Sequence, residues 1–253
     1  MNVSRYSVYD HFCLCIGLFT SVVTAMQEVV VLDYNDLIAD VDLSEQIESA
    51  FGFDGLGLLT VKNVPQLELF RSTLLPLAHS FSQLPQDVKD KYIHEESSYS
   101  FGWSHGKEKL EGKPDHSKGS FYANPQYDRP VDDDALVSQY PAFIHPNIWP
   151  TDDLPALEPA FKDLGRLIVS VGLLVAKQCD RFVKSKAPTY TDGKLHRIID
   201  KSLCCKARLL HYFPLEAGTI SDAGSTTSTR YFAAKLLSGW PFGLCTAVLA
   251  FLL

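Results

Sequence analysis

The sequence predicts an α+β protein in which amphipathic helices pack on short strands. Two stretches, 65–84 and 155–186, carry apolar residues every three to four positions, which is the spacing of a helix with one buried face. Three short apolar runs, at 29–32, 58–61 and 206–214, have the length and composition of strands. The 253 residues are enough to bury a core as one large domain or two small ones.

The amino-acid composition argues against several kinds of binding partner and structural site. A net charge of -7 without a Lys/Arg stripe argues against nucleic acid or an anionic membrane surface as the partner. Six cysteines without a C-x-x-C pair predict neither a disulfide framework nor a structural zinc site. We therefore expect a reducing compartment and a cytoplasmic protein.

Residues 1–25 differ in character from the rest of the chain. An apolar run spans 12–23, and Val-Thr-Ala at 23–25 resembles a signal-peptidase site, although Asp10 lies at the edge of the run. The run is too short to span a bilayer. The sequence favours an upstream extension, with the main region starting at Met26, and a secretory signal is the alternative.

The elements of the N-terminal part are predicted from local pattern. After the strand at 29–32, residues 42–51 have helical spacing with Ile47, Ala50 and Phe51 inward. The strand at 58–61 leads to Pro65, which suits the first turn of a helix. This helix has an apolar stripe made of Leu67, Phe70, Leu74, Leu77 and Phe81.

Residues 97–150 show little periodic structure and are rich in aromatic residues, proline and glycine. So long a stretch inside a compact protein is typical of a functional or wrapping loop. A surface loop fixed by its own aromatic side chains is the alternative. The glycines form neither G-x-G-x-x-G nor G-x-x-x-x-G-K-[ST], so nothing supports a nucleotide site.

The C-terminal part begins with the most regular element. Residues 155–186 predict one long helix, and 194–203 a short one with Leu195, Ile198 and Ile199 inward. In the following strand, alternation places Leu209, His211 and Phe213 on one face and Arg208, Leu210 and Tyr212 on the other.

Five motifs follow one another in the chain, at 54–65, 102–108, 118–125, 146–150 and 207–214. In this order they resemble the N-terminal region and first core strand of the 2-oxoglutarate- and iron(II)-dependent dioxygenases of the isopenicillin N synthase-like type. The resemblance implies an α+β fold with outer N-terminal helices and short strands packed on a partial double-stranded β-helix (jelly-roll) core. The resemblance divides the chain into three regions. Residues 26–203 correspond to the N-terminal region of the non-haem dioxygenases, and residues 204–214 to the first core strand of a truncated jelly roll. Residues 215–253 form a linker with a hydrophobic tail.

The family's chemistry implies iron(II) held by a His-x-Asp…His triad, 2-oxoglutarate gripped by Arg-x-Ser, and a small-molecule substrate. In this sequence no histidine follows His211, and the one later aspartate is Asp222. Arg-x-Ser occurs only at residues 5–7, at the wrong end of the chain. We therefore predict a truncated, catalytically incompetent member with no catalytic residue, no metal site and no cofactor.

One weak cofactor-binding candidate remains. Family members often have Asn and Tyr near the positions of His211 and Phe213, where those residues help hold the oxoacid. Phe213 has no hydroxyl, so this face is expected mainly to fill the core, and His211 is kept as a pocket-facing candidate.

Other histidines are weaker candidates. His94-Glu95-Glu96 satisfies His-x-Glu, and His145 is conceivable as a third iron ligand, but ordinary exposed side chains are the favoured interpretation. For His105 and His116 we expect surface or hydrogen-bonding roles.

The tail at 229–253 has no acidic residue and ends in uninterrupted apolar residues. A frame change or retained intron in the gene model is the favoured explanation, with a weak membrane anchor or a packed helix as alternatives. The other function class is a non-catalytic binding or regulatory protein that uses residues 97–150.

Overall fold

The computed structural model describes residues 28–110 and 112–214. The predictions for the segment 1–25 and for the tail 215–253 lie outside these residues. The described chain mixes helices with small sheets, as the sequence predicts. Within these residues, no helix combines the length and hydrophobicity needed to cross a bilayer.

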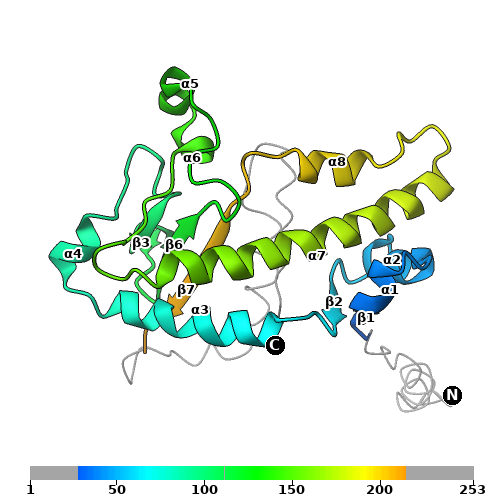
Figure 1. Cartoon of the computed structure of the whole chain (residues 1–253), viewed down its shortest axis with the longest axis horizontal. Coiled ribbons are helices and arrows are strands. Elements are labelled where there is room, and N and C mark those ends of the chain that lie inside the picture. Colours follow the sequence, from blue (N-terminus) through cyan, green and yellow to red (C-terminus); the bar gives the residue numbers. More distant parts are fainter. Residues whose placement is uncertain (1–27, 111, 215–253) are drawn as a thin grey trace, which may run out of the picture.

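The N-terminal elements form a small unit against one half of a long helix (Figure 1). β1 (Val30–Asp33) and β2 (Leu59–Lys62) pair in parallel, with α1 (Tyr34–Ile38) and α2 (Ser44–Phe51) between them in the chain. Leu32, Leu37 and Ile47 are buried against Val171 and Val175 of α7 (Leu157–Lys186). The prediction for Phe51 was wrong, because this last residue of α2 is 42% exposed.

Polar contacts hold this unit on α7. Asp40, which follows α1, accepts from Lys177 Nζ and Arg181 Nη2, both at 2.8 Å. The buried Gln178 accepts from the Leu43 backbone N–H at 3.3 Å. The segment between α1 and α2 is therefore fixed to the helix by charge as well as by apolar packing.

Two long helices form the layer beneath the main sheet. α3 (Leu67–Ser82) lies along the N-terminal half of α7, and the predicted stripe on α3 faces the core. The predicted helix at 155–186 is confirmed as α7, whose inner face carries Leu157, Phe161 and Leu164.

The main sheet has three antiparallel strands in the order β3-β6-β7. β3 (Gly102–His105) and β7 (Ala207–Tyr212) flank β6 (Lys118–Ala123), so a strand from the end of the described chain pairs with one about ninety residues earlier. This pairing confirms the strand predicted at 206–214. β4 (Lys109–Leu110) and β5 (Lys113–Pro114) form a short hairpin between β3 and β6.

The prediction of a long loop at 97–150 was wrong, because this stretch supplies two of the three sheet strands. Trp103 and Phe121 face each other across β3 and β6 and are almost fully buried. Gly119 is needed there, since a Cβ on it would lie 2.1 Å from the Trp103 ring. The strands are four and six residues long, too short to give a clear alternating pattern.

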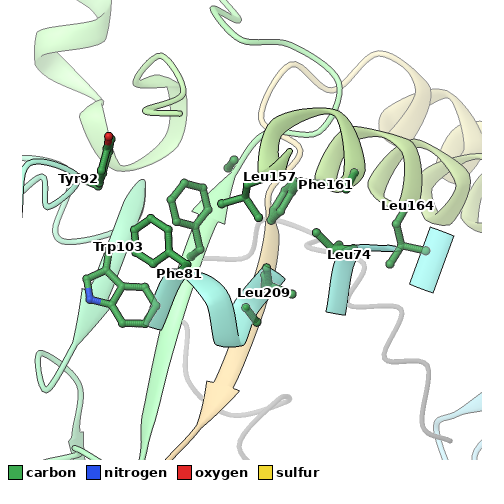
Figure 2. Close-up of a cluster of buried hydrophobic side chains, with 12 residues drawn as sticks. Leu74, Phe81, Tyr92, Trp103, Leu157, Phe161, Leu164 and Leu209 are labelled. Carbon is green, nitrogen blue, oxygen red and sulfur yellow. The ribbon is translucent and has the colours of Figure 1, made fainter. Parts of the chain in front are cut away.

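Figure 2 shows the core between the sheet and the two helices. Phe81 of α3 lies at its centre, with ring centroids 5.0 Å from Trp103 and 5.2 Å from Phe121. Leu209 of β7 closes the cluster from the neighbouring strand and is 6% exposed. Trp103 and Phe121 of the 97–150 stretch are thus core residues.

Four short helices complete the fold: α4 (Gln86–Asp90), α5 (Asp134–Gln139), α6 (Pro141–Ile144) and α8 (Lys194–Asp200). α8 docks on the end of α7 through the buried Asp180, which accepts from the backbone N–H groups of Leu195 and His196 at 2.8 Å. The inward orientation predicted for Ile198 was wrong, since this side chain is 50% exposed.

Candidate functional site

The β3-β6-β7 sheet has two faces of opposite character, and β7 shows both. Phe121 pairs with Leu209 in the register, so both point to the helix-covered face with Trp103. Ser120 and Tyr122 point the other way, as does Arg208, which is paired with Tyr122. We call this second side the polar face; the alternation predicted for β7 is confirmed.

Arg208 is at the centre of a charged cluster on the polar face. Its Nη2 lies 2.6 Å from Glu108 Oε1, and its Nε donates to the buried Ser120 Oγ at 3.0 Å. Tyr122 donates its hydroxyl to the same Glu108 oxygen at 3.0 Å. Lys118 Nζ bridges Glu108 and Asp115, at 3.0 and 3.3 Å.

The positive and negative charges of the cluster balance, and they determine the protonation states of Glu108 and Tyr122. Burial alone would raise the pKa of Glu108, but Arg208, Lys118 and the Tyr122 hydroxyl outweigh burial and hold this pKa below its usual value. Burial, with Glu108 nearby, raises the pKa of Tyr122 despite the opposing charge of Arg208. Glu108 is therefore an anion and Tyr122 a neutral donor near neutral pH.

The cluster lines a surface depression that its own side chains fill. Two cations and two anions satisfy one another there, so the arrangement offers hydrogen bonds rather than a free acid, base or nucleophile. Sequence reasoning missed the cluster because Glu108 and Arg208 are one hundred positions apart. The one sequence signal for this cluster was the alternation along β7, which places Arg208 and Leu209 on opposite faces of the strand.

The structure places His211 on the helix-covered face of β7. Its ring centroid lies 5.3 Å from His79 of α3 and 4.8 Å from Phe213. Partial burial, and then the charge of His79, lower the pKa of His211. With Leu209 buried and Phe213 packed on the same cluster, the core-filling role predicted for this face is confirmed. A role for His211 in holding a cofactor stays a prediction.

His94, Glu96 and His145 come together in space. The two imidazole centroids are 3.9 Å apart, and His94 Nε2 is 3.4 Å from Glu96 Oε2. His94 Nδ1 accepts from the Ser97 N–H, while His145 Nδ1 bonds the Pro146 carbonyl oxygen. Across residues 28–110 and 112–214, no three His, Cys, Asp or Glu side chains are arranged to hold a metal ion.

His105 is the last residue of β3, and His116 lies two residues before β6. His105 Nε2 donates to the His116 carbonyl oxygen at 3.0 Å, and the two rings meet edge to face. The hydrogen-bonding role expected for His105 is confirmed.

Residues 29–152 match a family model described as the non-haem dioxygenase in morphine synthesis N-terminal region. No curated protein matches the chain.

Solved structures match over a larger part of the chain. A 2OG-Fe(II) oxygenase family protein from Caulobacter crescentus gives a TM-score of 0.58 at 17% identity, covering 75% of this chain and 57% of that one. A C-terminally truncated Neurospora crassa protein in apo form gives a TM-score of 0.52 at 17% sequence identity. The match covers 76% of this chain and 64% of that one. The full-length form of that Neurospora crassa protein, in complex with alpha-KG, gives a TM-score of 0.51 at 21% sequence identity. The match covers 73% of this chain and 54% of that one. At these identities the likeness shows a shared fold, and this chain spans less than two thirds of each structure.

Proposed function

We propose that this chain is the N-terminal module of an iron(II)- and 2-oxoglutarate-dependent oxygenase with a small-molecule substrate, because residues 29–152 match the model of the non-haem dioxygenase N-terminal family. The family match is the observation that carries the proposal. The fold shared with 2OG-Fe(II) oxygenases over three quarters of the chain supports it. In this proposal β7 is the first strand of a jelly-roll core, and α3 and α7 are its outer helices.

The polar face is proposed as one wall of the substrate chamber, which leaves His211, on the opposite face of β7, outside that chamber. Its charged and hydroxyl groups, held by Arg208 and Glu108, lie on the side of the sheet away from the α3–α7 core. A jelly roll encloses its ligand between two sheets, so polar groups on the inner side of a strand suit a polar small molecule. The helix-covered face is already filled by Phe81, Phe121 and Leu209.

Iron does not fit the described residues. They contain no three-ligand arrangement for a metal, and the sequence has no histidine after His211. High-spin iron(II) in this class of enzyme needs two imidazoles and a carboxylate on one side of the metal. The proposal is therefore that residues 1–253 on their own neither hold iron nor oxidise a substrate.

The test is iron and cosubstrate binding by the purified full chain under anaerobic conditions. We expect iron retention after desalting, and succinate formation from 2-oxoglutarate after adding oxygen, to equal those of the heat-denatured chain. The Caulobacter crescentus protein serves as the folded comparison in the same assay. Retention of one iron per chain, or 2-oxoglutarate-dependent succinate, contradicts the proposal.

A variant pair locates any iron that does bind. If iron is retained and His145→Gln removes it while His211→Gln does not, the ligands are His94, Glu96 and His145. The reverse result places the iron at β7 instead.

A further inference from the structure

His79 and His211 bring two imidazole rings together from different elements. His79 lies in the last turn of α3, and His211 lies near the end of β7. Their ring centroids are 5.3 Å apart, and the ring planes are tilted by 50° to each other instead of stacked. Neutral imidazole is the commonest metal ligand among side chains, and it suits zinc, copper and nickel ions. The pair is therefore a candidate metal site.

The distance between the two rings fits two ligands of one ion. In tetrahedral zinc sites each imidazole nitrogen lies about 2.0–2.1 Å from the metal, which places the centroids of two such rings about 5 Å apart. The side-chain torsion that turns a histidine ring has a broad energy minimum, so the ring nitrogens can turn toward a shared ion at little cost. Binding by His79 and His211 thus requires ring rotation and no movement of the backbone.

Both backbones are fixed by the fold. β6 pairs with β7 along its length and holds His211 in the sheet, and Leu209, two residues earlier on the same face, is buried in the core. His79 follows Ala78 of α3, which is buried in the same core. Two ligands that are already held in place lose little conformational freedom when an ion binds, which favours chelation.

The pair is also accessible to a hydrated ion. His79 is exposed, and His211 is half-buried. A metal requires the neutral form of the imidazole, which is the main form of histidine side chains above about pH 7. Access, spacing and chemistry therefore agree at this position.

The His94–His145 pair provides an internal comparison. Its ring centroids are 3.9 Å apart. This is closer than the separation of about 5 Å for two ligands of one tetrahedral ion. Three of its four ring nitrogens already contact other polar atoms of the protein. By spacing and by hydrogen bonding, this second pair is the poorer chelator.

We propose that His79 and His211 form a two-imidazole site for a divalent transition-metal ion such as Zn²⁺, which bridges α3 and β7. Water occupies the remaining positions around the ion. Across residues 28–110 and 112–214 no third ligand completes a group, so this site differs from the two imidazoles and one carboxylate that iron requires in this class of enzyme. The inference is independent of the proposed function.

The experiment is calorimetric titration of the EDTA-treated full chain with Zn²⁺ at pH 7.5, for the wild type, His79→Gln, His211→Gln and the double variant. A second ligand on the same ion binds at a high effective concentration, so we expect either single substitution to weaken the affinity for Zn²⁺ at least tenfold. The double variant should be little weaker than either single variant. Unchanged affinity in a single variant overturns the proposal, as do single losses that add up in the double variant, because they indicate two separate sites.

A matched control and a second measurement complete the test. His145→Gln removes a histidine of the other pair and should keep the wild-type affinity for Zn²⁺; a tenfold loss there overturns the assignment. An ion that bridges two elements binds only the folded chain, so Zn²⁺ should raise the urea midpoint of the wild type and leave that of His79→Gln unchanged. Since His79 is exposed, the wild type and His79→Gln should share one midpoint in EDTA. A Zn²⁺-dependent rise that persists in His79→Gln overturns the bridge.

Discussion

At the scale of single residues, four of the described histidines form two pairs. His94 contacts His145 between two loops, and His79 of α3 contacts His211 of β7. In each pair a second proton would place two positive charges side by side in a partly buried place. Burial and then His94 lower the pKa of His145, and burial and then His79 lower that of His211.

These pairs predict that the fold weakens in mild acid. In the unfolded chain His145 and His211 bind protons near pH 6.5, while in the folded chain the lowered pKa of each means that they bind protons at lower pH. Between these values the unfolded state holds more protons, so the free energy of unfolding is highest above about pH 6.5 and falls as the pH drops through the lowered pKa. Urea denaturation at pH 7.5, 6.5 and 5.5 measures this fall.

Substitution of the two affected histidines provides the control for that prediction. His145→Gln and His211→Gln should each flatten the dependence of unfolding free energy on pH, and the double variant should flatten it further. An unchanged slope in the double variant contradicts the assignment to these pairs.

Residue-level contacts were only partly predictable from the sequence. Alternation along β7 correctly separated Arg208 from Leu209, because side-chain direction in a strand is local. Glu108 as the partner of Arg208 was not predictable, since that contact depends on how β3, β6 and the β4–β5 hairpin come together. The proximity of His94 to His145 was considered only within the disfavoured iron-ligand interpretation, and the structure brings the two rings together.

At the scale of elements, α7 contains two glycines with opposite surroundings. A Cβ on Gly165 would lie 2.4 Å from Pro125 Cβ, just after β6, whereas a Cβ on Gly172 would meet nothing within 4 Å. Arg166 reinforces this close approach by donating Nε to the Pro125 carbonyl oxygen at 3.1 Å. Gly165 therefore sets the distance between the helix and the end of the strand.

The two glycines form a matched pair for a stability prediction. Gly172→Ala should raise the free energy of unfolding by up to about 1 kcal/mol, because alanine is the better helix former. Gly165→Ala gains the same propensity but forces α7 away from Pro125, and should lower it by about 1–3 kcal/mol. Chemical denaturation of both variants checks the difference in sign. A stabilising effect of both substitutions would show that the contact at Pro125 yields easily.

Whether an element could be predicted depended on how much of its sequence pattern lies within one stretch of the chain. α3 and α7 were predicted nearly to their ends, because helical spacing repeats many times within one stretch. β3 and β6 were missed because each is short and takes its partner from elsewhere in the chain. Their aromatic residues gave the impression of a loop, whereas in the structure they are buried by α3 and α7.

At the scale of the whole molecule, β7 is an edge strand of the main sheet within the part of the chain that the structure describes. Among the described strands β7 has β6 as its one neighbour, and Tyr212 at its end is 51% exposed. A strand edge that lacks a second partner favours pairing with another chain. The shared fold is recognisable from family motifs, but the sheet's extent is not, since strand order is a property of the assembled molecule.

This edge predicts self-association of the purified chain. Apparent mass from light scattering after gel filtration should rise with protein concentration. Leu210→Lys, which adds a charge to the polar side of the edge strand, should shift the rise to higher concentration. The matched change Leu69→Lys, at an exposed position on α3, should leave it unchanged. Equal masses at all concentrations, with or without Leu210→Lys, would contradict an exposed edge.

The length of α7 has a consequence for how the molecule comes apart. Its first turns belong to the core under the main sheet and its later turns to the core under β1 and β2. Thirty residues of continuous helix span about 45 Å, so the two cores share one rod rather than a hinge. Melting one core while keeping the other requires breaking that rod near Ile168, with backbone hydrogen bonds lost on both sides of the break. We therefore expect the helix to couple the unfolding of the two separately packed regions.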